Sequence, residues 1–154
     1  MTQECLEVML EKGTYLVPTL TAVNNIYINR NNGIPDFIVE KTIRVRERHH
    51  QSIKMFYDAG GNIAMGTDAG TPFNVHGENS QELKFMIELG ISNNDALKFS
   101  TASAADLMGL VDRGQIKEGF YADLLIVSGN PVEDISAVSN QENHRSVIKN
   151  GAPV

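Results

Sequence analysis

The chain has 154 residues, of which 42% are hydrophobic and 21% are charged, and its formal net charge is -6. This composition suits one globular domain, and the acidic excess argues against a nucleic-acid-binding surface. A lone cysteine, Cys5, cannot form an internal disulfide, and no apolar run approaches the roughly 18 residues of a membrane span. Acidic residues near the N-terminus argue against a signal peptide. We therefore expect a cytoplasmic protein with no membrane partner, provided that Met1 is the first residue of the natural protein.

Hydrophobic periodicity predicts alternating helices and strands, followed by short strands alone. In chain order we expect a helix at 3–12, a strand at 14–20, a loop at 24–35, a helix at 36–57, a strand at 62–67, helices at 78–89 and 93–109, and strands at 122–127 and 146–149. Pro18 ends the first strand because proline cannot donate to a ladder. Ser92, with Asp95 three residues later, resembles a capping box, and Asn150-Gly151 is a turn signal. The repeated strand-then-helix unit indicates a parallel α/β fold.

Asp68 is the strongest candidate for a catalytic residue. It follows the apolar strand predicted at 62–67 and precedes a glycine-rich loop. In α/β barrels, catalytic groups lie at the C-terminal ends of the strands. A carboxylate in that position can bind a metal or accept a proton. The same spacing also fits an Asx-turn or a helix N-cap, so both interpretations stay open on spacing alone.

Several segments, taken together, resemble one family. Gly66-Thr67-Asp68-Ala69-Gly70-Thr71-Pro72-Phe73-Asn74-Val75-His76-Gly77 is similar to strand eight and loop eight of imidazolonepropionase-like and prolidase-like amidohydrolases. Residues 13–20 resemble strand seven of that family, and residues 101–110 resemble its helix after strand eight. Residues 114–127 resemble the return to its small β-sandwich, and the likeness extends to 129–135. The motifs occur in the family's order and cover nearly the whole chain.

The resemblance implies an α/β fold built from part of a TIM-type (β/α)8 barrel, followed by part of a small β-sandwich. Residues 1–112 would supply strands seven and eight with their helices, and residues 113–154 would supply sandwich strands. In that family the strand-eight aspartate, which matches Asp68, ligates a metal. It also carries the proton from the attacking hydroxide to the leaving amine. Such a metal makes hydroxide available near neutral pH and polarises the substrate carbonyl.

Two further residues are candidates for the substrate pocket. His76 lies in the loop after Asp68 and by resemblance lines the pocket, although a surface position is equally compatible. Val75 stands where the family often has proline. Tyr15 begins the predicted strand at 14–20 and fits either a substrate-binding role or a core position, of which the core position is favoured. The basic residues between 41 and 48 are typical of the solvated outside of a helix.

The family's other metal ligands have no counterpart in this sequence. The family uses a His-x-His pair from strand one, commonly a bridging Lys or Glu from strand four, and one His each from strands five and six. The four histidines are His49, His50, His76 and His144, and no two are separated by one residue. The complete enzyme would hold a divalent metal, zinc by resemblance. We expect the isolated chain to bind none tightly.

These observations predict the C-terminal portion of a metal-dependent amidohydrolase that hydrolyses a C–N bond in a small amide, cyclic amide or dipeptide. Its expected partners are that substrate and either a missing N-terminal half or another copy of the chain. On this view the chain is inactive alone, because a full barrel takes about 250 residues. The alternative is a non-catalytic remnant that acts as an oligomeric or interaction module.

Overall fold

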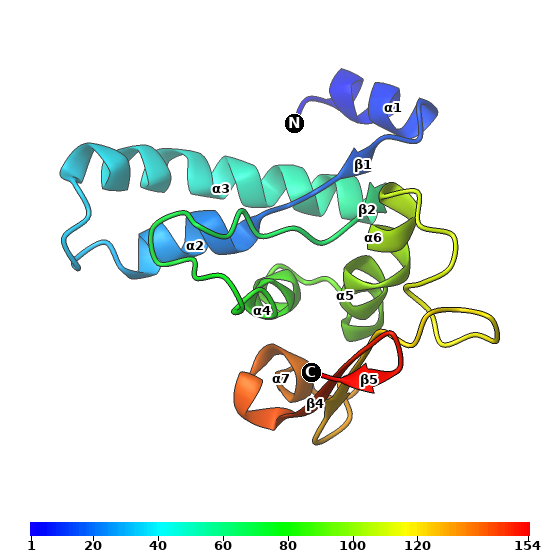
Figure 1. Cartoon of the computed structure of the whole chain (residues 1–154). Helices are drawn as coiled ribbons and strands as arrows, with labels where there is room; N and C mark the ends of the chain where they lie inside the picture. Colours follow the sequence, from blue (N-terminus) through cyan, green and yellow to red (C-terminus); the bar gives the residue numbers. More distant parts are fainter.

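The computed structural model describes residues 1–154 and contains helices and two small sheets, one of which lies at an end of the molecule (Figure 1). The N-terminal part contains α1 (Gln3–Glu11), β1 (Tyr15–Leu16), α2 (Leu20–Ile28), α3 (Asp36–Asp58) and β2 (Asn62–Ile63). The middle contains α4 (Gln81–Glu88), α5 (Asn93–Ser100) and α6 (Ala102–Leu107). The C-terminal part contains β3 (Leu124–Val127), α7 (Ser136–Ser139), η1 (Gln141–Asn143), β4 (His144–Lys149) and β5 (Ala152–Pro153).

The first sheet is the parallel pair expected from the alternation of strands and helices. Tyr15 of β1 pairs with Asn62 of β2, and Leu16 pairs with Ile63. The ordered ladder is shorter than the predicted strands because the chain leaves it early. The Ala64 amide still donates to Leu16, but the Met65 amide donates to the Phe99 carbonyl on α5.

The second sheet is antiparallel, with strand order β3-β4-β5, and lies at one end of the molecule beyond α4 and α5 (Figure 1). The predicted turn joins β4 to β5, and both its central residues adopt positive φ, 51° at Asn150 and 81° at Gly151. Such angles suit a tight hairpin whose twist matches its strands. The helix α7 and the short η1 between β3 and β4 were not predicted.

The core lies where α1, α3, α4 and α5 close over the parallel pair. Twelve buried side chains form one cluster: Leu6, Leu20, Ile53, Phe56, Ile63, Leu83, Phe85, Met86, Ile91, Ala96, Phe99 and Ile135. Gly61 follows α3 where a Cβ atom would lie 2.4 Å from the Phe56 ring, so only glycine fits this reversal before β2.

Two predicted elements were wrong in their bounds. The asparagine-rich segment expected as a loop begins inside α2, which continues to Ile28. Its asparagines gain tertiary partners: Asn25 donates to the Phe73 carbonyl at 2.8 Å, and Asn24 accepts from Arg46. Such partners outweigh a weak local propensity. The helix expected at 93–109 divides at Thr101 into α5 and α6.

Gly114 packs against the chain where the helix divides. A Cβ atom on Gly114 would lie 2.9 Å from the Thr101 carbonyl oxygen, so only glycine fits this close approach. The N-terminal end of α5 agrees with the sequence, since the Ser92 hydroxyl accepts from the Asp95 amide at 3.1 Å. None of the helices is long and apolar enough to cross a bilayer. The cytoplasmic location stays a prediction.

Candidate functional site

Asp68 lies beyond the C-terminal end of β2, on a segment that passes close to the residues after β1. A Cβ atom on Gly66 would lie 2.4 Å from a methyl carbon of Val17, so the two segments approach where only glycine fits. Asp68 itself has φ of 52°, a left-handed conformation that aspartate tolerates better than most residues. Its side chain is exposed, and the next helix does not begin until Gln81. Asp68 therefore caps no helix.

The loop after Asp68 is held together by its own hydrogen bonds. Asn74 is buried, and its side-chain amide donates to the Thr67 carbonyl at 2.5 Å and to the Thr71 hydroxyl at 3.1 Å. The Thr71 amide and hydroxyl both approach the Asp68 carbonyl. These bonds fix the backbone of Asp68 while leaving its carboxylate free to meet a ligand.

His76 folds back toward this loop. Its Nε2 would lie 3.5 Å from a Cβ atom placed on Gly70, two residues after Asp68. The ring is exposed. The structure thus brings His76 to the same loop as Asp68, and its role in substrate binding stays a prediction.

Tyr15 lies at the other end of the parallel pair. It begins β1, where it pairs with the first residue of β2, and its hydroxyl donates to the Asp106 carboxylate. This hydrogen bond raises the pKa of the Tyr15 phenol. Because Asp68 follows the opposite ends of the strands, Tyr15 and Asp68 are not brought together, and we leave Tyr15 out of the proposed site.

A buried carboxylate near Asp68 was missed by the sequence analysis. Glu82 of α4 has no exposed surface and accepts three hydrogen bonds at the N-terminus of α2. The Leu20 amide donates at 2.7 Å, the Thr21 amide at 2.7 Å and the Thr21 hydroxyl at 2.6 Å. Thr19, which precedes the helix, has φ of 46° and makes no capping bond. Glu82 therefore caps α2 from another helix.

The electrostatics of Glu82 combine opposing effects. Burial raises the pKa of its carboxyl, the three hydrogen bonds lower it, and the negative charge of Asp68 raises it further. The pKa lies above its ordinary value as a result. In the sequence, Glu82 directly precedes the apolar Leu83 within a predicted helix, which is compatible with a buried position. A single acidic residue at such a place is nevertheless typical of an exposed helix surface.

The chain does not form a metal centre by itself. No three of its His, Cys, Asp or Glu side chains are grouped closely enough to hold a metal ion. A catalytic zinc site uses three protein ligands and a water molecule. The residues present therefore do not fit a complete metal site, because Asp68 belongs to no group of three such side chains.

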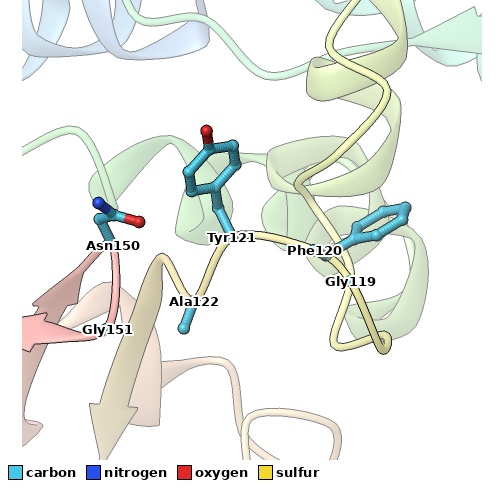
Figure 2. Close-up of a pocket in the computed structure, with 6 residues that line it drawn as sticks. All are labelled: Gly119, Phe120, Tyr121, Ala122, Asn150 and Gly151. Carbon is cyan, nitrogen blue, oxygen red and sulfur yellow. The ribbon is translucent and has the colours of Figure 1, made fainter.

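Two hollows of the surface are lined by other residues. Figure 2 shows one of about 360 Å³, lined by Gly119, Phe120, Tyr121, Ala122, Asn150 and Gly151 at the start of β3 and the β4–β5 turn. A larger apolar groove of about 730 Å³ lies between β3 and the α5–α6 region. Asp68 and His76 line neither of them.

Comparison with known proteins identifies the family. The Amidohydrolase family profile matches residues 3–154. Ochratoxinase from Aspergillus niger is 29% identical over 152 residues, which make up 97% of this chain and 31% of ochratoxinase. Its crystal structure superposes with a TM-score of 0.81 at 30% identity, covering 99% of this chain and 34% of that one. The chain therefore belongs to the amidohydrolase family.

A second solved structure extends the likeness. A Xaa-Pro dipeptidase, solved with methionine bound in its active site, is 35% identical with a TM-score of 0.86. The match covers 100% of this chain and 37% of the dipeptidase chain. Adenine deaminase from Lactobacillus delbrueckii subsp. bulgaricus is 32% identical over 114 residues, 72% of this chain and 19% of that protein. The chain thus spans between 19% and 37% of the length of these relatives.

Proposed function

We propose that this chain is the C-terminal portion of a metal-dependent amidohydrolase that hydrolyses a C–N bond in a small amide, cyclic amide or dipeptide. The observation that carries the proposal is Asp68. It is an exposed carboxylate without a hydrogen-bond partner, held on a fixed loop just beyond a parallel strand, in a chain of the amidohydrolase family.

In this proposal the parallel pair corresponds to strands seven and eight of a (β/α)8 barrel. Residues 1–112 belong to the barrel, and residues 113–154 contribute β3, β4 and β5 to a small sandwich. The supporting features are the parallel register of β1 and β2 and the separate antiparallel sheet. Strands with open outer edges leave backbone groups that neighbouring strands would satisfy.

Asp68 would move a proton during the reaction. Hydrolysis adds water to the carbonyl carbon and breaks the C–N bond, so one proton must leave the water and one must reach the departing nitrogen. A free carboxylate at the strand end can accept the proton from the water and then donate it to the departing nitrogen. A divalent metal, zinc by analogy with the family, would need its other ligands from residues outside this chain.

The chain alone is therefore expected to be inactive, and a chimera tests the proposal. The 37% of the Xaa-Pro dipeptidase that this chain matches is replaced by the chain itself. We expect the chimera to bind metal and to hydrolyse dipeptides, and Asp68→Asn to lower kcat by a factor of about 10² or more.

The matched control is Asp58→Asn, an exposed aspartate at the end of α3 that pairs only with Lys54. It should leave kcat unchanged. A chimera that folds, binds metal and hydrolyses dipeptides equally well after the Asp68→Asn substitution would overturn the role of Asp68. Turnover by the isolated chain that Asp68→Asn abolishes would overturn its expected inactivity.

A second candidate function rests on the missing ligand set. A chain with one candidate ligand and an open apolar groove also suits a non-catalytic remnant that persists as an oligomeric or interaction module. The DNA upstream of Met1 separates the two. An in-frame His-x-His segment there favours the enzyme.

A further inference from the structure

A cluster of basic side chains lies where the second half of α2 packs along α3, which run side by side in Figure 1. The guanidinium carbon of Arg46, on α3, lies 4.6 Å from the centre of the Tyr27 ring on α2. That of Arg30, just after α2, lies 4.6 Å from the same centre. The two guanidinium carbons are therefore at most about 9 Å apart, and both groups make cation–π contacts with the Tyr27 ring.

Both arginines lack a counter-charge within the chain. Neither appears in any of its ion pairs, although the chain carries a net charge of -6. Arg46 donates from Nε to the Asn24 side chain at 2.8 Å, and Arg30 donates from Nη1 to the Tyr27 carbonyl at 2.8 Å. A guanidinium has five N–H donors. Most donors of this pair are thus left for a ligand or solvent.

His50 lies one helical turn after Arg46. Its Nε2 is buried and has no hydrogen-bond partner. Burial, the positive charge of Arg46 and the neighbouring His49 lower the pKa of His50 to about 4, so the ring is neutral at pH 7. Because Nε2 is closed to solvent, His50 supplies neither a positive charge nor an accessible donor, and the two arginines alone face a ligand.

We propose that Arg30 and Arg46, both stacked on Tyr27, form a binding site for a small oxyanion, a phosphate or a carboxylate. The observations combine two guanidinium groups without a counter-charge and one aromatic ring against which both lie. Forked guanidinium donors match the geometry of phosphate and carboxylate oxygens.

Tyr27 lies seven residues after Leu20, so the cluster is roughly 10 Å further along α2 than the end that Glu82 caps. Arg44 and Arg48 on the same helix are exposed and make no stacking contact, which distinguishes a solvated basic face from the cluster. The proposal does not depend on the enzymatic function.

Calorimetric titration of the whole chain tests the site, with inorganic phosphate in one arm and succinate in the other, at constant ionic strength. We expect saturable binding of one anion per chain. Arg46→Met should weaken it by about tenfold or more, and Arg30→Met by a similar factor. His50→Phe should change it by less than about twofold, because the ring nitrogen is closed to solvent and the ring is neutral. Tighter binding of phosphate or of succinate identifies the class of oxyanion, and either supports the site.

The matched control is Arg44→Met, which removes one positive charge from the same helix outside the cluster. It should change the affinity by less than about twofold, since it acts only through screened charge. Circular dichroism verifies that each variant folds. If Arg46→Met does not fold, Arg30→Met, at an exposed position after α2, still tests the site. An absence of saturable binding of either anion up to about 10 mM, or equal losses in Arg44→Met and Arg46→Met, would overturn the proposal.

Discussion

Asp68 and Glu82 are two carboxylates in different surroundings at the same end of the parallel strands. Asp68 is exposed on a loop, whereas Glu82 has no exposed surface and both its carboxylate oxygens accept hydrogen bonds from α2. The negative charge of Asp68 nevertheless raises the pKa of Glu82, so the two carboxylates interact electrostatically. The Asp68 carboxylate is thus available for a ligand, whereas the Glu82 carboxylate stabilises the start of α2.

At the residue scale, the first prediction concerns metal content. The isolated chain should retain no stoichiometric zinc after dialysis against buffer without metal, because Asp68 has no companion ligands. Elemental analysis of the purified chain measures this. About one tightly held zinc ion per chain would contradict the prediction and would require a site that includes another histidine.

The second prediction concerns pH. The pKa of Glu82 is raised above its ordinary value of 4.5, so the folded chain binds this proton more tightly than the unfolded chain does. The resulting contribution to stability is fully present below about pH 4.5 and is lost as pH rises through the raised pKa. Urea unfolding of the wild type and of Glu82→Gln from pH 4 to 8 measures it.

The difference in unfolding free energy, wild type minus Glu82→Gln, should therefore fall as pH rises. Taking a difference removes the opposite trend from Asp95, Asp123 and Asp134, whose hydrogen bonds lower their pKa values. A difference that grows with pH would mean that the three hydrogen bonds outweigh burial.

At the scale of elements, α2 shows how a helix can start without a local signal. Its N-cap residue, Thr19, makes no side-chain bond, and its first amides are satisfied by α4. A carboxylate also complements the positive end of the helix dipole. The start of α2 therefore depends on the docking of a helix that lies much later in the chain.

The third prediction follows from this dependence. Glu82→Leu should destabilise the chain by about 1–3 kcal/mol for each buried amide left unsatisfied, those of Leu20 and Thr21. Chemical unfolding monitored by circular dichroism gives the value. Glu88→Leu, at an exposed position of the same helix, is the matched control and should cost less than about 0.5 kcal/mol. Equal effects of the two substitutions would show that the cap contributes little.

At the scale of the whole molecule, the chain exposes more surface than a compact protein of its mass. Its accessible surface is 9269 Å², against about 7,700 Å² for a compact monomer of 16.9 kDa. The parallel sheet has two strands with open outer edges, and apolar side chains such as Met108, Val111 and Ile116 are largely exposed. The excess, roughly 1,600 Å², is about twice what one partner contributes to a standard protein interface.

The fourth prediction is that the purified chain self-associates or requires a partner. Exposed strand edges and apolar surface both favour pairing with another copy or with the remainder of an enzyme. Sedimentation velocity at micromolar concentrations should show species larger than 16.9 kDa whose population rises with concentration. A compact monomer that unfolds cooperatively would contradict both this prediction and the barrel-fragment interpretation.

Local sequence determined much of this protein by itself. Strong helical periodicity marked α1 and α3, the Ser92 signal marked α5, and Asn150-Gly151 marked the hairpin, because caps and turns depend on neighbouring residues. Asp68 stood out because an apolar strand followed by a polar tip is also a local pattern. The family's motifs then gave it a chemical role that spacing alone left open.

Only the tertiary structure decided the features that depend on distant segments. Glu82 accepts from the first amides of α2, Gly114 packs closely against Thr101 where α5 and α6 divide, and Arg46 stacks on Tyr27 where two helices meet. In each case the hydrogen bond, close approach or charge contact joins residues far apart in the chain. A linear pattern carries no record of such pairs, so a buried carboxylate and an unpaired arginine both look like ordinary surface until the fold brings their neighbours together.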